Sequence, residues 1–357
     1  MHRLQRSDGH LELGLANASD DLELRQFLRD NSAEVPGGTA FLREPSFMLG
    51  ASVQGHFIQI PIVRREGKIV LIGSRAIRTL RVNGNVENIG YLGDLRVHRD
   101  HRRGTLLRAA YRFLQELDRD KRCRFYISVI GESNEAALTT IAANRAGLPS
   151  YIDCGRVLVP AVDVSSGMGV RSSVVSRGSW SQLPDIVERL NQCDDQFAPA
   201  YATPDFVSGR FPGFVPENFY LILKKGKVAS VMGLWDQRSF RQTMILGLAA
   251  ELNALFDAFG GNPPKIDLVD RVAPVAYICF VATEGPEDYL TLLSQACLDA
   301  RESAVSHVIV GLHERDTRVK TLHSFKSVDY GVRLYLVNYG DDVHLDDRVP
   351  HFDPAFV

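Results

Sequence analysis

The chain has 357 residues, of which 41 are Lys or Arg and 43 are Asp or Glu, so its formal net charge is −2. Apolar residues make up 45% and charged residues 24%, which is ordinary for a globular protein and excludes a disordered, collagen-like or coiled-coil chain. The near-zero charge argues against a protein that coats nucleic acid, and the length predicts about two domains.

The cysteines and the apolar runs predict an intracellular, soluble chain. The five cysteines are scattered, with no CxxC pair and no zinc-ribbon spacing, which indicates buried thiols in a reducing compartment. The N-terminal residues lack the apolar core of a secretory signal. The longest uncharged run, 45–63, contains Gln54, His56 and Gln59, so it does not predict a membrane span. We therefore expect a cytoplasmic protein.

The N-terminal half predicts a strand, a helix and three strands, followed by helix, strand, helix and strand. Ser19 and the acidic residues after it are typical of a helix start, and Asn83-Gly84 between two β-branched runs is a hairpin signal. Apolar residues at helical spacing from Leu106 to Leu117 predict an amphipathic helix. The expected strands are 11–15, 56–64, 68–80, 86–97, 125–130 and 151–162, the expected helices are 20–30, 106–117 and 133–144, and 33–48 is expected to be an irregular, substrate-facing segment.

A similar order of elements returns in the C-terminal half, after a small, polar, glycine-containing linker. The expected helices are 181–191, 287–300 and 317–325, and the expected strands are 220–224, 228–235, 242–248, 275–282, 307–312 and 332–339. This order predicts an α/β (α+β) fold of two tandem domains, each a mixed, mostly antiparallel sheet flanked by helices. The expected domains are 1–162 and 175–340, joined by the linker 163–174 and followed by a C-terminal tail over 341–357.

The most informative stretch runs from an apolar strand into a basic turn and then into an amphipathic helix. Between Arg96 and Arg124 there are ten Lys or Arg and four Asp or Glu, a local net charge of 10 − 4 = +6. Backbone N–H groups at a helix start are unpaired, and the helix dipole adds positive potential there. This pattern favours a phosphate or pyrophosphate ligand, and the alternative is a solvated basic helix face.

This turn and the order of elements resemble the GNAT superfamily of CoA-dependent N-acyltransferases. In that family a strand of the form Leu-x-Val leads into a loop of Arg or Gln, two residues, Gly, one residue, and Gly or Ala. Leu95 and Val97 match the strand and Arg102 matches the basic residue, so that other residues stand at the two glycine positions. The resemblance implies that acetyl-CoA, or another acyl-CoA, is bound by Leu95, Arg96, Val97, Arg102, Arg103, Gly104, Thr105, Leu106, Leu107 and Asn134.

Two further features bear on the resemblance. On the following helix Asn134 and Ala137 match the family, but Ile141 stands where the family often has the Tyr that is its usual general acid. The C-terminal half resembles the same fold, yet its equivalent turn, 281–288, carries three acidic residues that would repel a pyrophosphate. We expect this half to be a degenerate copy without a CoA site.

The resemblance implies that an amine attacks the thioester directly while the pantetheine arm lies along residues 95–97. Such an attack needs a neutral amine, a polarised carbonyl and a proton donor for the leaving thiolate. The candidate catalytic residues are Tyr91 and Asp94 on the strand, Glu132 just past the next strand end, and Tyr126 as an acid. We expect burial to raise the pKa of Asp94. An ordinary structural role is the alternative for each of them.

Three functions remain open from the sequence. The chain is expected to be an N-acyltransferase, most simply an N-acetyltransferase, with acyl-CoA and the amine of a small molecule or peptide as its partners. The alternatives are a catalytically inactive binding or regulatory protein of the same fold and a nucleic-acid binder that uses the basic stretch. We expect no nucleic acid and no membrane as partners, and a homodimer is left open. His98 and His101 lack further ligands nearby, so no metal site is expected.

Overall fold

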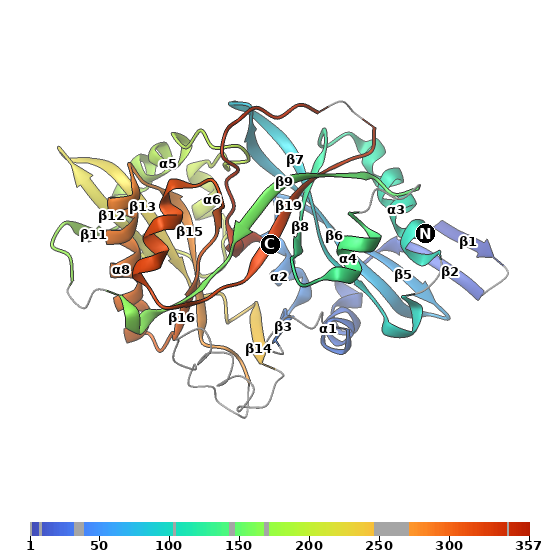
Figure 1. The fold of residues 1–357 in the computed structure, drawn as a ribbon. Coiled ribbons are helices and arrows are strands. Elements are labelled where there is room, and N and C mark those ends of the chain that lie inside the picture. The colour runs from blue at the N-terminus through green and yellow to red at the C-terminus, as the bar shows by residue number, and fades with distance from the viewer. Residues whose placement is uncertain are drawn as a thin grey trace.

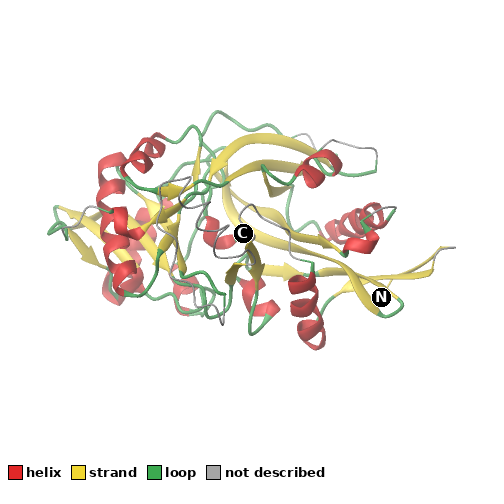
Figure 2. Cartoon of the chain, turned by 60° about the horizontal axis from the view of Figure 1, so that its bottom comes forward, coloured by secondary structure: helices red, strands yellow, loops and turns green. Residues whose placement is uncertain are grey.

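The computed structural model describes residues 2–6, 9–31, 39–102, 105–142, 147–167, 171–245, 271–340 and 343–357. Two β-sheets lie side by side with helices packed against them, and the end of the chain lies between the two halves (Figure 1). Figure 2 shows long strands of the N-terminal half running between helices above and below them.

The first sheet is built mainly from the N-terminal half. Its strands are β1 (His2–Arg6), β2 (Gly9–Leu15), β4 (Phe57–Gln59), β5 (Pro61–Arg65), β6 (Lys68–Val82), β7 (Asn85–Val97), β8 (Tyr126–Gly131), β9 (Ser150–Leu158), β17 (Leu312–His313) and β19 (Gly331–Asn338). They follow the order β1-β2-β5-β6-β7-β8-β19-β9-β17, with β4 also paired to β6. The helices of this half are α1 (Asp21–Asp30), α2 (Phe47–Ser52), α3 (Leu106–Leu117) and α4 (Glu135–Thr140).

The second sheet has the order β11-β12-β13-β15-β16-β10-β18. These strands are β10 (Ala161–Asp163), β11 (Val175–Arg177), β12 (Phe219–Lys224), β13 (Lys227–Trp235), β15 (Val275–Ala282), β16 (His307–Ile309) and β18 (Ser327–Val328). The helices are α5 (Leu183–Asn191), α6 (Thr203–Val207) and α8 (Pro286–Glu302), and a 3-10 helix spans Thr317–Ser324. A separate two-stranded ladder pairs β3 (Thr39–Leu42) with β14 (Gln242–Ile245).

The predicted hairpins and the α/β class of two similar halves are confirmed. Asn83 and Gly84 have φ angles of 53° and 81° between β6 and β7, the left-handed pair that a two-residue hairpin turn requires. The turn between β12 and β13 at Lys225 and Gly226 has the same geometry, with φ of 52° and 77°. Local turn chemistry is thus sufficient to place these hairpins.

The two halves exchange strands, which the sequence analysis does not foresee. The C-terminal strand β19 lies between β8 and β9 of the first sheet and pairs antiparallel with both. In return, β10 from the N-terminal half lies between β16 and β18 of the second sheet. A strand's period of two residues encodes which face is buried but not which neighbour it pairs with, so local patterns cannot reveal such an exchange.

Three predicted elements of the C-terminal half differ in detail. The strand expected at 242–248 is described only to Ile245, and it pairs with β3 instead of joining the second sheet. The run 307–312 forms two short strands that belong to different sheets. The helix expected at 317–325 is a 3-10 helix. Among the described helices, none combines the length and the apolar composition needed to cross a membrane.

Candidate active site

The central feature of the first sheet is a split between the parallel strands β7 and β8. They pair only at Gly90–Tyr126 and Tyr91–Ile127 and then diverge. Gly90 sits at the closed end, where any side chain would collide with the Tyr126 ring. Just beyond, Asp94 has a φ of 53° and the register with β6 shifts between Ile72 and Ser74. This bulge turns the strand away from its neighbour, and beyond Tyr91 this edge of β7 has no strand partner among the described residues.

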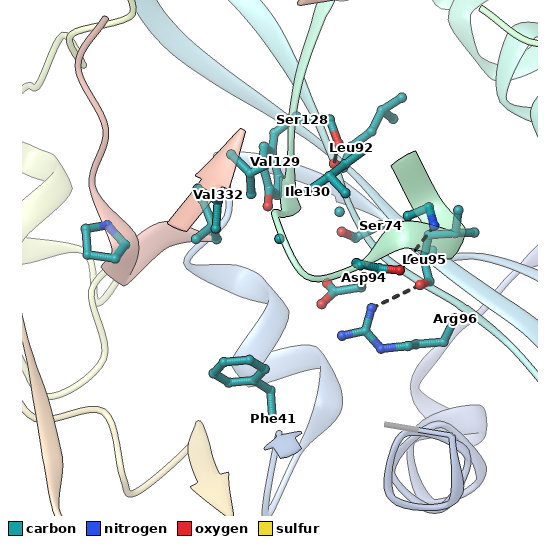
Figure 3. A pocket seen from close by; sticks show the side chains of 18 of the residues that line it. Phe41, Ser74, Leu92, Asp94, Leu95, Arg96, Ser128, Val129, Ile130 and Val332 are labelled. Atoms are coloured by element: carbon teal, nitrogen blue, oxygen red, sulfur yellow. Dashed lines mark hydrogen bonds between the residues drawn. The ribbon is translucent and has the colours of Figure 1, made fainter. Parts of the chain in front are cut away.

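A cavity of about 510 Å³ opens at this split. Its walls come from β6, β7 and β8, from helices α3 and α4, and from residues of β3, β14 and the C-terminal tail. Most of the lining is apolar, and the polar groups gather at the bulge. Figure 3 shows Asp94, Arg96 and Ser74 close together there, with the Phe41 ring across the opening.

Asp94 is held in place by two buried partners. Its carboxylate accepts hydrogen bonds from Arg43 at 2.5 Å and from the Gln54 amide at 2.9 Å. Burial acts to raise the pKa of Asp94, but Arg43, Arg96 and these hydrogen bonds outweigh it, and the pKa lies below its ordinary value of 3.8. The expectation of a raised pKa is therefore wrong, because the sequence pattern does not show the arginines that surround the carboxyl.

Tyr91 lines the same cavity and is fully buried. Burial raises the pKa of its hydroxyl to about 12, so it is protonated at neutral pH. The Arg78 guanidinium stacks on its ring at 4.3 Å from the ring centre. The structure therefore brings Tyr91 and Asp94, two of the four predicted catalytic residues, to one cavity.

Tyr126 and Glu132 lie outside the cavity lining and are engaged elsewhere. The Tyr126 hydroxyl donates to Asp118 at 2.7 Å and accepts from Nε of the fully buried Arg75 at 2.8 Å. Burial holds the pKa of this hydroxyl well above its usual range. Glu132 forms an ion pair with Arg156 at 3.0 Å. These contacts favour the structural alternative for both residues.

Tyr126→Phe should lower the free energy of unfolding and leave catalysis nearly unchanged. The substitution leaves Nε of Arg75 buried without a partner, a loss of about 1–3 kcal/mol. Chemical denaturation would measure this loss, and kcat/KM should stay within about twofold of the wild type. Tyr91→Phe is the matched comparison, because it removes a hydroxyl from the cavity itself. A large fall in kcat for Tyr126→Phe, with Tyr91→Phe active, would restore Tyr126 as the acid.

The residues predicted to bind the cofactor fall into three groups. Leu95, Arg96 and Asn134 line the cavity, and the Asn134 side chain also caps α4 by accepting from Ala137 N–H. Val97 pairs with Leu71 and does not line the cavity. The third group belongs to the basic turn and the start of α3. Arg102 is exposed, Thr105 precedes the first helical residue, and Leu106 and Leu107 pack into the core. Arg103 and Gly104 lie outside the described residues.

The sequence analysis misses several polar residues of the cavity, among them Ser74, Arg43 and Arg241. Ser74 lies in β6 opposite Gly93, and its buried hydroxyl has no hydrogen-bond partner among the described residues. Arg43 follows β3 in the segment expected to be irregular and substrate-facing, and Arg241 precedes β14. A serine or arginine with no motif around it gives no signal in one sequence, because only packing shows that it is buried at a site.

The second half has an equivalent split that its own tail fills. The parallel strands β15 and β16 pair over three residues, and Phe280 has a φ of 50° where β7 has Asp94. Asp353 accepts from the Phe280 N–H at 3.0 Å, and Phe352 and Pro354 pack against Gly311. A cavity of only about 20 Å³ is left beside them, too small for a pantetheine arm. The acidic turn is likewise engaged, since Glu284 binds Lys224.

The described residues contain one cluster with metal-ligand spacing, Cys193, Asp195 and His351, whose ligand atoms lie within 4.8 Å of one another. The Arg318 guanidinium is 3.9 Å from the Asp195 carboxylate and already supplies a positive charge there. We therefore assign no metal to this cluster.

In the basic turn, His98 lies beside Asp100, and its ring is 5.5 Å from that of His101.

The fold is similar to that of solved acyltransferases, although no family model and no curated protein matches the sequence. Saccharomyces cerevisiae N-myristoyltransferase with bound myristoyl-CoA superposes with a TM-score of 0.64 at 13% identity, covering 95% of this chain and 81% of that chain. A GCN5-related glucosamine N-acetyltransferase region of a fungal multi-domain β-N-acetylglucosaminidase gives 0.63 at 12% identity, covering 92% of this chain and 38% of that chain. The chain therefore has the GNAT fold, in a two-half form.

Proposed function

We propose that this GNAT-fold chain is an N-acyltransferase that moves an acyl group from acyl-CoA to an amine. The observation that carries the proposal is the split between β7 and β8, which opens at the Asp94 bulge into a cavity of about 510 Å³. An unpaired strand edge can bind an extended arm through backbone hydrogen bonds, and the basic turn at the start of α3 can bind its phosphates. The bulge at Asp94 and the basic turn after Val97 lie at the two ends of the last segment of β7.

Acyl-CoA would supply the acyl group as a thioester: the amine nitrogen bonds to the carbonyl carbon, the C–S bond breaks, and the thiolate takes the electron pair. In this chain the ionised Asp94 attracts the ammonium form of the acceptor and holds the nitrogen at the split. Because the low pKa of Asp94 makes it a weak base, the ammonium loses one proton to water before the neutral amine attacks, and the nitrogen loses a second proton to water or to the leaving thiolate once the C–N bond has formed. Ser74 and Tyr91 carry hydroxyls that can donate to the thioester oxygen or to the leaving sulfur.

The apolar lining favours an acyl group longer than acetyl. Leu92 and Ile130 on the strands, Phe113 and Leu114 on α3 and Ile141 after α4 all face the cavity, and none of them has a polar side chain. Each buried methylene contributes about 0.8 kcal/mol, a gain of about fourfold in affinity. The sequence analysis expects acetyl as the simplest donor, whereas the size and lining of the cavity support a longer chain.

Thermal denaturation in the presence of acyl-CoAs tests the donor site. The melting temperature should rise with acetyl-CoA and rise further with longer acyl-CoAs at equal concentration, until the cavity is filled. A ligand at 100 times its Kd stabilises the native state by about 2.7 kcal/mol, which is a measurable shift. The variant Arg102→Ala, Arg103→Ala should lose most of the shift for every donor, because it removes phosphate contacts and leaves the cavity intact.

Three outcomes separate the alternatives. Release of free CoA that depends on an added amine supports the enzyme. Binding without any release supports a binding protein that has lost catalysis. No shift with any acyl-CoA at millimolar concentration contradicts the proposal, and salt-dependent retention on DNA or RNA would then favour a nucleic-acid binder.

A further inference from the structure

Positively charged side chains gather in the cavity at the bulge. Three arginines line it there, Arg43, Arg96 and Arg241, and Asp94 is the carboxylate among them. The other acidic residue of the lining, Asp329, is exposed at the rim. Asp94 interacts electrostatically with all three arginines, so the four side chains form one cluster, which we call the arginine cluster.

Arg43 is built into this cluster and still has an unused donor. It is only 4% exposed, and its guanidinium lies 4.7 Å from the centre of the Phe47 ring. Its aliphatic stem lies 2.7 Å from the place that a side chain on Gly50 would take, so the α2 glycine makes room for it. Nη2 donates to Asp94, whereas Nη1 is buried with no hydrogen-bond partner among the described residues. A buried unpaired guanidinium nitrogen is costly unless a ligand accepts from it.

Arg96 and Arg241 form no ion pair within hydrogen-bond distance of a side-chain carboxylate among the described residues. Arg96 donates to the Leu95 backbone oxygen at 3.0 Å, and its Nε is buried without a partner. Arg241 donates to Gln237 at 3.0 Å, to the backbone oxygen of Ala355 and to an oxygen of the carboxyl group of Val357, the last residue of the structure. Burial lowers the pKa of both guanidinium groups, and Asp94 acts against that shift. Figure 3 shows the Arg96 guanidinium pointing into the space between Asp94 and Phe41.

We propose that the acceptor is a small amine that carries a carboxylate, such as a free amino acid, and that the arginine cluster binds this carboxylate. The inference rests on the proposed function and names the acceptor class for it. An amino acid has a cation and an anion close together, and the cluster has the matching pair, Asp94 beside Arg43 and Arg96. A guanidinium binds a carboxylate through two parallel hydrogen bonds, and Arg43 and Arg96 each offer a nitrogen without a partner.

Matched pairs of acceptors test the inference. Free CoA release is measured with an acyl-CoA and with glycine against glycinamide, β-alanine against β-alaninamide, and phosphoethanolamine against ethanolamine. We expect kcat/KM to be about 10- to 100-fold higher for the carboxylates than for the matched amides, because a hydrogen bond between charged groups contributes a free energy of this size. The amides are less basic and more often neutral at pH 7, so their intrinsic reactivity acts against this result. A preference for phosphoethanolamine over the amino acids would assign the cluster to a phosphate instead and overturn the carboxylate.

The variant Arg96→Gln separates recognition from catalysis. It should lower the ratio of kcat/KM for the carboxylate acceptor to kcat/KM for its neutral amide by about tenfold or more, because only the acid loses a charged partner. Arg333→Gln, on β19 and paired with Asp153 at 2.5 Å outside the cavity, is the matched control and should leave all values unchanged. Equal loss for the acid and the amide would overturn the inference.

The two proposals fail in different ways. If wild-type protein turns over the amides as fast as the acids, the acceptor class is wrong and the acyltransferase stands. If no amine of either kind releases CoA although acyl-CoA binds, the proposed function fails and the inference falls with it.

Discussion

Replacing Asp94 with Asn should lower kcat/KM by about 100-fold or more while the protein stays folded. The carboxylate is the negative group of the arginine cluster and, in the proposed function, the group that holds the acceptor nitrogen at the split. Its removal takes away the negative charge beside Arg43 and Arg96, and the remaining positive charge repels an ammonium. Asn tolerates the positive φ of 53° at this position and can still accept from Gln54, so the bulge should persist.

Steady-state kinetics and thermal denaturation check this result together. Asp153→Asn is the control, because Asp153 is ion-paired with Arg333 away from the cavity. The pKa of Asp94 lies below 3.8, so the carboxylate is ionised throughout the neutral range and no inflection of the pH–rate profile arises from it. The wild-type rate should rise with pH as the acceptor amine loses its proton. Two results would contradict the role of Asp94 as an ionised group that holds the acceptor nitrogen. One is a wild-type pH–rate profile with an inflection near neutral pH that is lost in Asp94→Asn, and the other is an unchanged kcat/KM in this variant.

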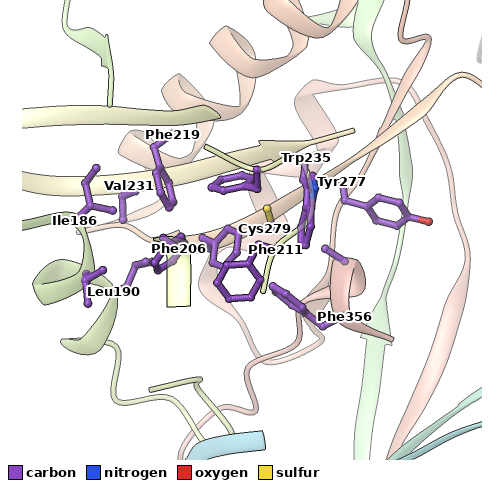
Figure 4. Packing of buried hydrophobic residues seen from close by; sticks show 14 of the residues in the cluster. Ile186, Leu190, Phe206, Phe211, Phe219, Val231, Trp235, Tyr277, Cys279 and Phe356 are labelled. Atoms are coloured by element: carbon purple, nitrogen blue, oxygen red, sulfur yellow. The ribbon is translucent and has the colours of Figure 1, made fainter. Parts of the chain in front are cut away.

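Phe356→Ala should lower the free energy of unfolding by about 3–5 kcal/mol, the usual loss when a core aromatic ring is removed. The ring belongs to the C-terminal tail and is 7% exposed. Its centre lies 5.7 Å from that of Trp235, 5.8 Å from Phe211 and 5.4 Å from Phe280. Figure 4 shows Phe356 among the aromatic side chains Phe211 and Trp235. The tail thus contributes to the core of the second half, and the neighbouring Val357 lines the cavity of the first.

Chemical denaturation measures the loss, and Leu22→Ala is the control because Leu22 is 67% exposed on α1. Loss of the ring should also reduce activity at temperatures where the variant is still folded, since Arg78 donates to the Phe356 backbone oxygen and stacks on Tyr91. A stability change below about 1 kcal/mol would mean that the tail is not docked as described.

Much of the local structure follows from local residue patterns. The Asn83-Gly84 turn, the amphipathic α3 and the strand leading to Val97 are short-range features, because turn geometry and side-chain period depend on neighbouring residues. The resemblance also directed attention to Asp94 and Tyr91 on the strand before Leu95-x-Val97, and their catalytic roles stay predictions. The assignment of the basic turn to a cofactor stays a prediction.

The chemistry of the site depends on contacts between residues that are far apart in the sequence. Arg43, Asp94 and Arg241 come from three separate parts of the chain, and their proximity reverses the direction of the expected pKa shift. The same holds for Tyr126, whose partners remove it from the candidate acids.

The sequence by itself determined the class of fold, the repeat of its elements, the hairpins, the main helices and the strand on which the bulge lies, because these follow from propensity and period. Only the tertiary structure decided the exchange of β10 and β19, the tail that fills the second split, and the charge of the cavity. Strand partners, burial and electrostatic environment are set by long-range packing, and a pattern that extends over ten residues contains no information about them.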